Sequence, residues 1–193
     1  MEFIKSEHLY LNDYGIIIPS VTQLISWKLG SGYDDVPKEI LKRKAEYGTG
    51  IHALIEKYHE TGSYKATNPY QVASLEAYKS LASKLPNVSA CEEMVCFDNR
   101  LAGTIDLIYE DGSLGDIKTY ATLDEHALLK LRWQLSLYTM CKYGDDKEAF
   151  LKKGHLVWLP KSMTFKTQEI ELFSYEDCIA LLEEYEKAQV EPK

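Results

Sequence analysis

Residues 101–120 read LAGTIDLIYEDGSLGDIKTY, and this stretch decides the fold because it places two alternating strands around a tight turn. Asp106 falls in the first strand, and Asp116 and Lys118 fall in the second. Side chains along a strand alternate between the two faces of a sheet, so the length of the turn determines whether these charged groups meet.

Two turn lengths fit this hairpin. A two-residue turn, residues 111–112, pairs Asp116 with Leu107 and sends Asp106 to the opposite face. A three-residue turn, residues 110–112, places Asp106 opposite Asp116 instead. We predict the three-residue turn, because glycine in its left-handed position is a standard hairpin form. It also sorts the faces: Asp106, Asp116 and Lys118 share one face, floored by Ile108 and Leu114, and Ile105, Leu107 and Ile117 share the other.

This register favours a metal site. Two carboxylates directly across a strand pair have Cβ atoms roughly 5 Å apart. Magnesium prefers about two carboxylates together with waters and phosphate oxygens. Lys118 points to the same side as Asp116, where it can stabilise a water-derived nucleophile or the charge on an attacked phosphate. We therefore expect Mg²⁺ here, with Mn²⁺ as its substitute.

The remaining chain predicts one α/β (α+β) domain over residues 1–193, with a mixed central β-sheet flanked by helices. It divides into N-terminal helices in 1–86, a catalytic αβ core in 87–171 and an acidic C-terminal helix in 174–189. The expected helices are 20–27, 37–60, 69–84, 124–142 and 174–189, and the expected strands are 90–97, 101–109, 113–119, 154–160 and 163–171.

Composition narrows the class of protein. No apolar run is long enough for a membrane helix and no signal peptide opens the chain, so we expect a cytoplasmic, intracellular protein that does not bind membranes. None of the four cysteines forms a C-x-x-C pair, so neither a disulfide framework nor a zinc site is expected. The net charge of −8 argues against a protein that coats nucleic acid. Much of that charge lies in residues 168–189, which hold seven acidic side chains and one lysine.

Four short motifs stand in a definite order: EYGTGIHALIE at 46–56, G-T-I-D at 103–106, D-I-K-T at 116–119 and QLSLY at 134–138. Together they resemble the PD-(D/E)XK nuclease superfamily, specifically its RecB-like and phage-exonuclease branch. PSVTQLISW at 19–27 also resembles the opening helix of that branch. The resemblance implies a restriction-endonuclease-like core.

The resemblance also implies roles for individual residues. Asp106, Asp116 and the backbone carbonyl of Ile117 are expected to hold the metal, with His52 as a further ligand. Glu93 matches the acidic residue that often precedes the first aspartate, and its neighbour Glu92 remains an alternative.

Two further residues of the resemblance lie in the 124–142 segment. Gln134 and Tyr138 share a helix face at i and i+4, and they are expected to brace the active site and contact nucleic acid. With Asp106, Asp116, Lys118 and Glu93 they complete the expected catalytic set. No cysteine precedes Cys91, so the iron–sulfur cluster of some relatives is not expected.

The implied activity is that of a metal-dependent deoxyribonuclease, an exonuclease that hydrolyses phosphodiester bonds in phage or mobile-element recombination or in DNA processing. A CRISPR-associated nuclease is the alternative setting. The expected partner is DNA, and a homo-oligomer or a recombination partner protein is compatible with the sequence. The alternative function is a non-catalytic nucleic-acid-binding or adaptor module, which the negative net charge favours and the intact Asp106, Asp116 and Lys118 oppose. The cations available for phosphates are Lys38, Lys42, Arg43, Lys44, Lys130 and Arg132.

Overall fold

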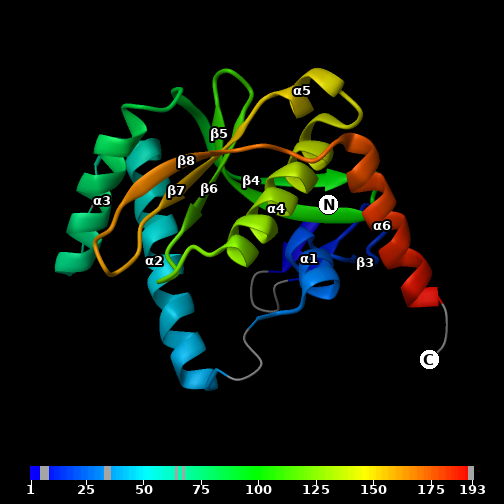
Figure 1. The fold of residues 1–193 in the computed structure, drawn as a ribbon, viewed down its shortest axis with the longest axis horizontal. Helices are drawn as coiled ribbons and strands as arrows, with labels where there is room; N and C mark the ends of the chain where they lie inside the picture. The colour runs from blue at the N-terminus through cyan, green and yellow to red at the C-terminus, as the bar shows by residue number, and fades with distance from the viewer. Residues whose placement is uncertain (5–8, 33–35, 64, 67, 191–193) are drawn as a thin grey trace.

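The computed structural model describes residues 1–4, 9–32, 36–63, 65–66 and 68–190. Runs of strands are followed by runs of helices along these residues (Figure 1). In chain order they are β1 (Glu2–Ile4), β2 (Leu9–Leu11), β3 (Ile17–Ile18), α1 (Val21–Leu29), α2 (Lys38–Thr61), α3 (Pro69–Ala82), β4 (Val88–Phe97), β5 (Leu101–Tyr109), β6 (Leu114–Lys118), α4 (Glu125–Tyr143), α5 (Lys147–Leu151), β7 (Gly154–Trp158), β8 (Lys166–Ile170) and α6 (Tyr175–Val190).

The centre of the protein is a five-stranded mixed sheet with the order β4-β5-β6-β7-β8. Neighbouring strands are antiparallel except β6 and β7, which run parallel. A parallel pair needs a long crossover, and α4 and α5 supply it between these two strands. The prediction of an α/β protein with a mixed central sheet flanked by helices is therefore confirmed.

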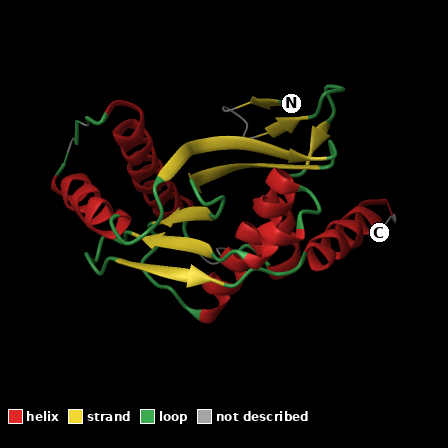
Figure 2. Ribbon diagram, turned by 90° about the horizontal axis from the view of Figure 1, so that it is seen from above, coloured by secondary structure: helices red, strands yellow, loops and turns green. Residues whose placement is uncertain are grey.

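Helices cover both faces of this sheet (Figure 2). On one face, α1, α4 and α6 pack into a core that includes Leu24, Leu135 and Leu182. On the other face, α2 and α3 pack onto the sheet through a second core that includes Ile51 and Leu75. The strands that carry the site residues are thus held rigidly between two layers of helices.

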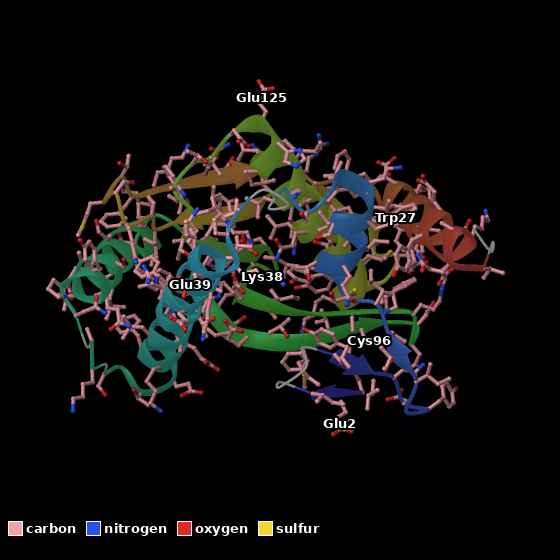
Figure 3. The ribbon with its side chains drawn as sticks, turned by 90° about the horizontal axis from the view of Figure 1, so that it is seen from below. Glu2, Trp27, Lys38, Glu39, Cys96 and Glu125 are labelled. Atoms are coloured by element: carbon pink, nitrogen blue, oxygen red, sulfur yellow. The ribbon has the colours of Figure 1, made fainter. Side chains whose placement is uncertain are left out.

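The N-terminal region contains a small sheet that the sequence did not indicate. The strands β1, β2 and β3 form an antiparallel sheet, and Tyr10 and Ile18 pack with Ala102 of β5. In Figure 3, Glu2 of this sheet lies on the same side of the molecule as Cys96 of β4. Residues 1–86 are therefore not purely helical, contrary to the prediction from the sequence. The small sheet was missed because strands of two or three residues are too short to produce a recognisable alternation.

The expected helices and the strands of the main sheet are all present within two or three residues of their predicted ends. The N-cap residues explain where two helices begin. Ser20 forms a capping box with Gln23 at the start of α1, and Asp124 accepts a hydrogen bond from the backbone of Ala127 in α4. The short helix α5 was not predicted. No helix in the described ranges is both long and apolar enough to cross a membrane.

Candidate metal centre

The hairpin between β5 and β6 has the predicted three-residue turn. The backbone N–H of Tyr109 donates to the carbonyl of Ser113 at 3.0 Å, and Gly112 has a φ of 80°. Ile108 pairs with Leu114 and Leu107 pairs with Gly115. Continued by one residue, this register would place Asp106 opposite Asp116, but the Cα pairing ends at Leu107 and Gly115, before these two residues.

The two strands separate just where the two aspartates lie. The Cα pairing of β5 with β6 ends at Leu107, whereas β6 continues alongside β7 through Lys118. In place of a backbone acceptor, Asp106 Oδ2 accepts the hydrogen bond of the Ile117 N–H at 2.7 Å. The carboxylate of Asp106 is therefore fixed in position by the sheet itself.

One detail of the predicted faces is wrong. Leu107 and Ile117 pack together against α2 and α3, as expected, and Ile108 and Leu114 pack in the other core. Ile105, however, packs with Ile108 and not with Leu107. The regular alternation of β5 is interrupted at Asp106, where the backbone of Glu92 on β4 adopts a φ of 50°.

His52 of α2 lies between two carboxylates. Its Nδ1 is 3.4 Å from Glu92 Oε1 and 3.4 Å from Asp106 Oδ1. Its Nε2 lies 3.0 Å from the carbonyl oxygen of Ile117, to which it can donate a hydrogen bond. One ligand atom from each of His52, Glu92 and Asp106 lies within 4.8 Å of the others, a spacing that allows all three to bind one metal ion.

The acidic residue of β4 that joins this cluster is Glu92, the alternative that the sequence left open. Cys91 pairs with Leu107 and Glu93 with Ile105, so Glu92 lies opposite Asp106. Glu93 forms an ion pair with Lys142 of α4 and does not line the cleft around the cluster. The positive φ of Glu92 is a strained conformation for a non-glycine residue, and such strain is concentrated at functional sites.

A second set of polar groups begins at Asp116. Lys118 Nζ lies 2.9 Å from Asp116 Oδ1 in a hydrogen bond and 2.7 Å from Oδ2. The same ammonium donates to Gln134 Oε1 at 2.9 Å, and Gln134 Nε2 donates to the Tyr138 hydroxyl at 3.2 Å. The structure thus brings Gln134 and Tyr138 of α4 to the site, as predicted.

Burial and charge shift the pKa values of these groups. Burial lowers the pKa of His52, but the carboxylates of Asp106 and Glu92 outweigh it and raise the value to about 10. Burial raises the pKa of Asp106, but the charge of His52 outweighs it and holds the carboxyl below its usual range. Burial raises the pKa of Asp116 to about 6 even though the charge of Lys118 opposes it. Of the two aspartates, Asp116 is therefore the one whose ionisation is less favourable in the folded protein.

The two sets of groups line one cleft of about 810 Å³. Its walls are α1, α2, α4, the strands β4, β5 and β6, and the N-terminal sheet, which contributes Phe3 and Tyr10. Gly103 lies at its floor, where a Cβ would stand 2.5 Å from Tyr138 Cε1, so glycine permits the close approach of β5 and α4. The cleft combines negative charge, one ammonium group and a space open to a ligand.

Comparisons with known proteins identify no family for this chain. The structure is similar to the protein described as "Crystal structure of SSO0001", with a TM-score of 0.46 and 16% sequence identity over 90% of this chain and 76% of that chain. No family model matches the chain, and no curated protein matches it. Likeness at this level carries no functional argument, so the function must be argued from the site.

Proposed function

We propose that this protein is a divalent-metal-dependent deoxyribonuclease of the PD-(D/E)XK type, working on DNA ends. The observation that carries the proposal is the convergence of His52, Glu92 and Asp106 on one point, with Asp116 and Lys118 on the adjacent strand. Three residues that the sequence resemblance assigned to the site, from α2, β5 and β6, come together in the fold.

The donor set fits Mg²⁺ or Mn²⁺. Carboxylate oxygens and an imidazole nitrogen are the ligands available, and small hard cations of this class accept both. Both carboxylate oxygens of Asp116 lie within 3 Å of the Lys118 ammonium, so this carboxylate would be shared between Lys118 and a bound ion.

The residues that would hold the ion are Asp106, Asp116, Glu92 and His52, with the Ile117 carbonyl at the same edge. A bound ion of this kind supplies a Lewis acid, which lowers the pKa of a coordinated water and neutralises negative charge on a phosphate. To bind as a ligand through Nδ1, His52 gives up the proton that its raised pKa otherwise retains.

Lys118 is the group that can act on the reacting atoms directly. Its side chain is 22% exposed, so the ammonium faces the cleft although it is fixed by Asp116 and Gln134. From this position it can orient an attacking water or donate to a phosphate oxygen as charge builds there. Gln134 and Tyr138 are positioning residues, since they hold the ammonium from the side of α4.

The assay compares end-labelled linear DNA with closed circular DNA, in Mg²⁺ or Mn²⁺ and with a chelator. We expect linear DNA to be degraded with either metal and to survive in the chelator. Degradation of both forms would make the enzyme an endonuclease. Undiminished cleavage in the chelator would contradict the metal mechanism, and no cleavage with either metal would favour the adaptor module.

Adjacent glutamates on β4 provide a matched control. Glu92→Gln removes a carboxylate from the cluster and is expected to lower cleavage at least a hundredfold. Glu93→Gln makes the same chemical change one residue away, at a side chain paired with Lys142, and is expected to retain activity. Equal activity of the two variants would contradict the assignment of Glu92.

A further inference from the structure

A second cavity, of about 660 Å³, adjoins the cleft on the side of the first half of α2. We call it the side pocket. It lies between residues 40–48 of α2, the 117–121 segment that follows the metal cluster, and the turn at 161–162. In Figure 1, the first half of α2 extends beyond the sheet.

The side pocket and the cleft share a wall. Gly48, His52 and Lys118 line both cavities. A chain that places one phosphate beside Lys118 in the cleft therefore has its next unit at the entrance of the side pocket. The two cavities can hold consecutive parts of one polymer.

The charges of the two cavities are opposite. Glu56, Glu92, Asp106 and Asp116 line the cleft, whereas none of the described residues that line the side pocket is acidic. Four Lys and Arg side chains line it instead. Lys118 is paired with Asp116, whereas within the described part of the chain Arg43, Lys44 and Lys161 take part in no ion pair. In a protein with a net charge of −8, such a local excess of positive charge indicates an anionic ligand.

One of these cations is held in place by an aromatic ring. Lys161 Nζ lies over the ring of Tyr47, 4.6 Å from its centroid, and the Tyr47 hydroxyl is 3.1 Å from the hydroxyl of Ser74 in α3. The hydrogen bond fixes the ring, and the ring attracts the ammonium by a cation–π interaction. Lys161 is thus presented to the pocket without a carboxylate that would neutralise it.

The lining of the pocket is largely apolar and includes Ile117, which is buried, Leu41, which is half-buried, and Ile40, which is exposed. An apolar cavity of this size with a few cations suits a small amphiphilic anion, and a nucleotide has this chemistry: a flat base and a charged phosphate. Since the pocket opens at the proposed reaction centre, the nucleotide belongs to the substrate strand.

We propose that the side pocket binds one unpaired nucleotide next to the scissile phosphate, with the base in the apolar interior and the adjacent phosphate on Arg43 and Lys161. The inference rests on the proposed nuclease function and specifies its substrate. A base inside this pocket cannot pair with a complementary strand, so the enzyme acts on single-stranded or frayed ends.

The test measures binding rather than cleavage, with a chelator present throughout. A fluorescein-labelled oligothymidylate and a blunt hairpin duplex of the same label are titrated with the protein, and fluorescence anisotropy is recorded over a range of salt concentrations. The variant is Arg43→Gln/Lys161→Gln. The matched control is Lys57→Gln, which removes a positive charge from the same helix outside both cavities.

We expect the double variant to bind the single strand about tenfold or more weakly. The salt slope should fall by about 0.7, since both side chains contact one phosphate and each phosphate contact to a single strand contributes about that much. Lys57→Gln and Lys161→Arg should bind as the wild type does, because a guanidinium also stacks on Tyr47. Thermal melting of each variant establishes that it is folded.

The outcomes separate the two proposals. Wild-type binding without metal-dependent cleavage would contradict the nuclease function and leave the subsite intact. Normal cleavage with unchanged binding by the double variant would contradict the subsite and leave the nuclease function intact. An equal loss for single strand and duplex would contradict the unpaired base, and the absence of any wild-type binding would overturn the subsite.

Discussion

Replacing Asp116 by asparagine should stabilise the metal-free protein while abolishing its activity. Asp116 is 1% exposed, and burial raises the pKa of its carboxyl from 3.8 to about 6. A shift of about two units corresponds to about 3 kcal/mol. This pKa already includes the attraction between Lys118 and the carboxylate, so we expect the free energy of unfolding to rise by about 1–3 kcal/mol at pH 7.5.

The effect should depend on pH in a defined direction. The folded-state pKa of Asp116 lies above its unfolded value, so the ionised carboxylate destabilises the fold at pH values above about 6. Below pH 3.8 the group is protonated in both states and contributes nothing. The advantage of Asp116→Asn is therefore full above pH 6 and is lost as the pH falls from 6 toward 3.8.

Thermal unfolding followed by circular dichroism measures this difference, which should appear as a rise in Tm of about 3–10 °C for a protein of this size. The control is Asp145→Asn, which changes an exposed aspartate in the turn after α4 and should leave Tm unchanged. Added Mg²⁺ should stabilise the wild type but not Asp116→Asn, which narrows the gap. The reasoning would be refuted by a lower Tm for Asp116→Asn than for the wild type at pH 7.5. A difference in Tm between the two proteins that does not change with pH would refute it as well.

Three further predictions concern neighbouring groups. His52 should remain protonated to pH 8 in the metal-free protein, because its pKa is raised to about 10. The protonated form adds stability that is complete below pH 6.5 and is lost as the pH rises toward 10. NMR titration measures the pKa, with His59, whose pKa is lowered by burial, as the internal comparison. Gly103→Ala should destabilise the fold by about 1–3 kcal/mol in chemical denaturation, because its Cβ would clash with Tyr138. Gly112→Val should destabilise more than Gly112→Asn by about 1 kcal/mol, because β-branched residues tolerate its φ of 80° least; equal effects would contradict this.

The hairpin could be predicted because two independent signals agreed. Gly112 favoured a three-residue turn, and the alternation of apolar and polar residues favoured the same register. From that register alone Asp106, Asp116 and Lys118 were expected to meet, and the order of the motifs added His52 and the pair on α4. Local sequence is sufficient here because a short turn transmits its geometry directly to the strands.

The remaining features depend on geometry that the sequence does not encode locally. Selecting Glu92 over Glu93 requires the loop between β4 and β5 to contain three residues, and in it Asp98 and Asn99 adopt positive φ without being glycine. Ile105 lies in a different core from Leu107, and no local pattern in the sequence indicates this change of face within β5. The side pocket combines segments more than a hundred residues apart, so only the tertiary fold could disclose it.

Asp106 and Asp116 should be retained to different extents when a protein of this kind evolves without selection for catalysis. Asp106 supplies the acceptor for the Ile117 N–H where the strands part, so its loss would leave a buried donor unpaired and weaken the fold whether or not catalysis needs it. Asp116 is a buried charge that weakens the metal-free fold. In a lineage released from selection for catalysis, drift should therefore remove Asp116 early and retain Asp106. A descendant that keeps only the first aspartate is then the expected form of a decayed enzyme, and its surviving carboxylate is evidence of folding, not of activity.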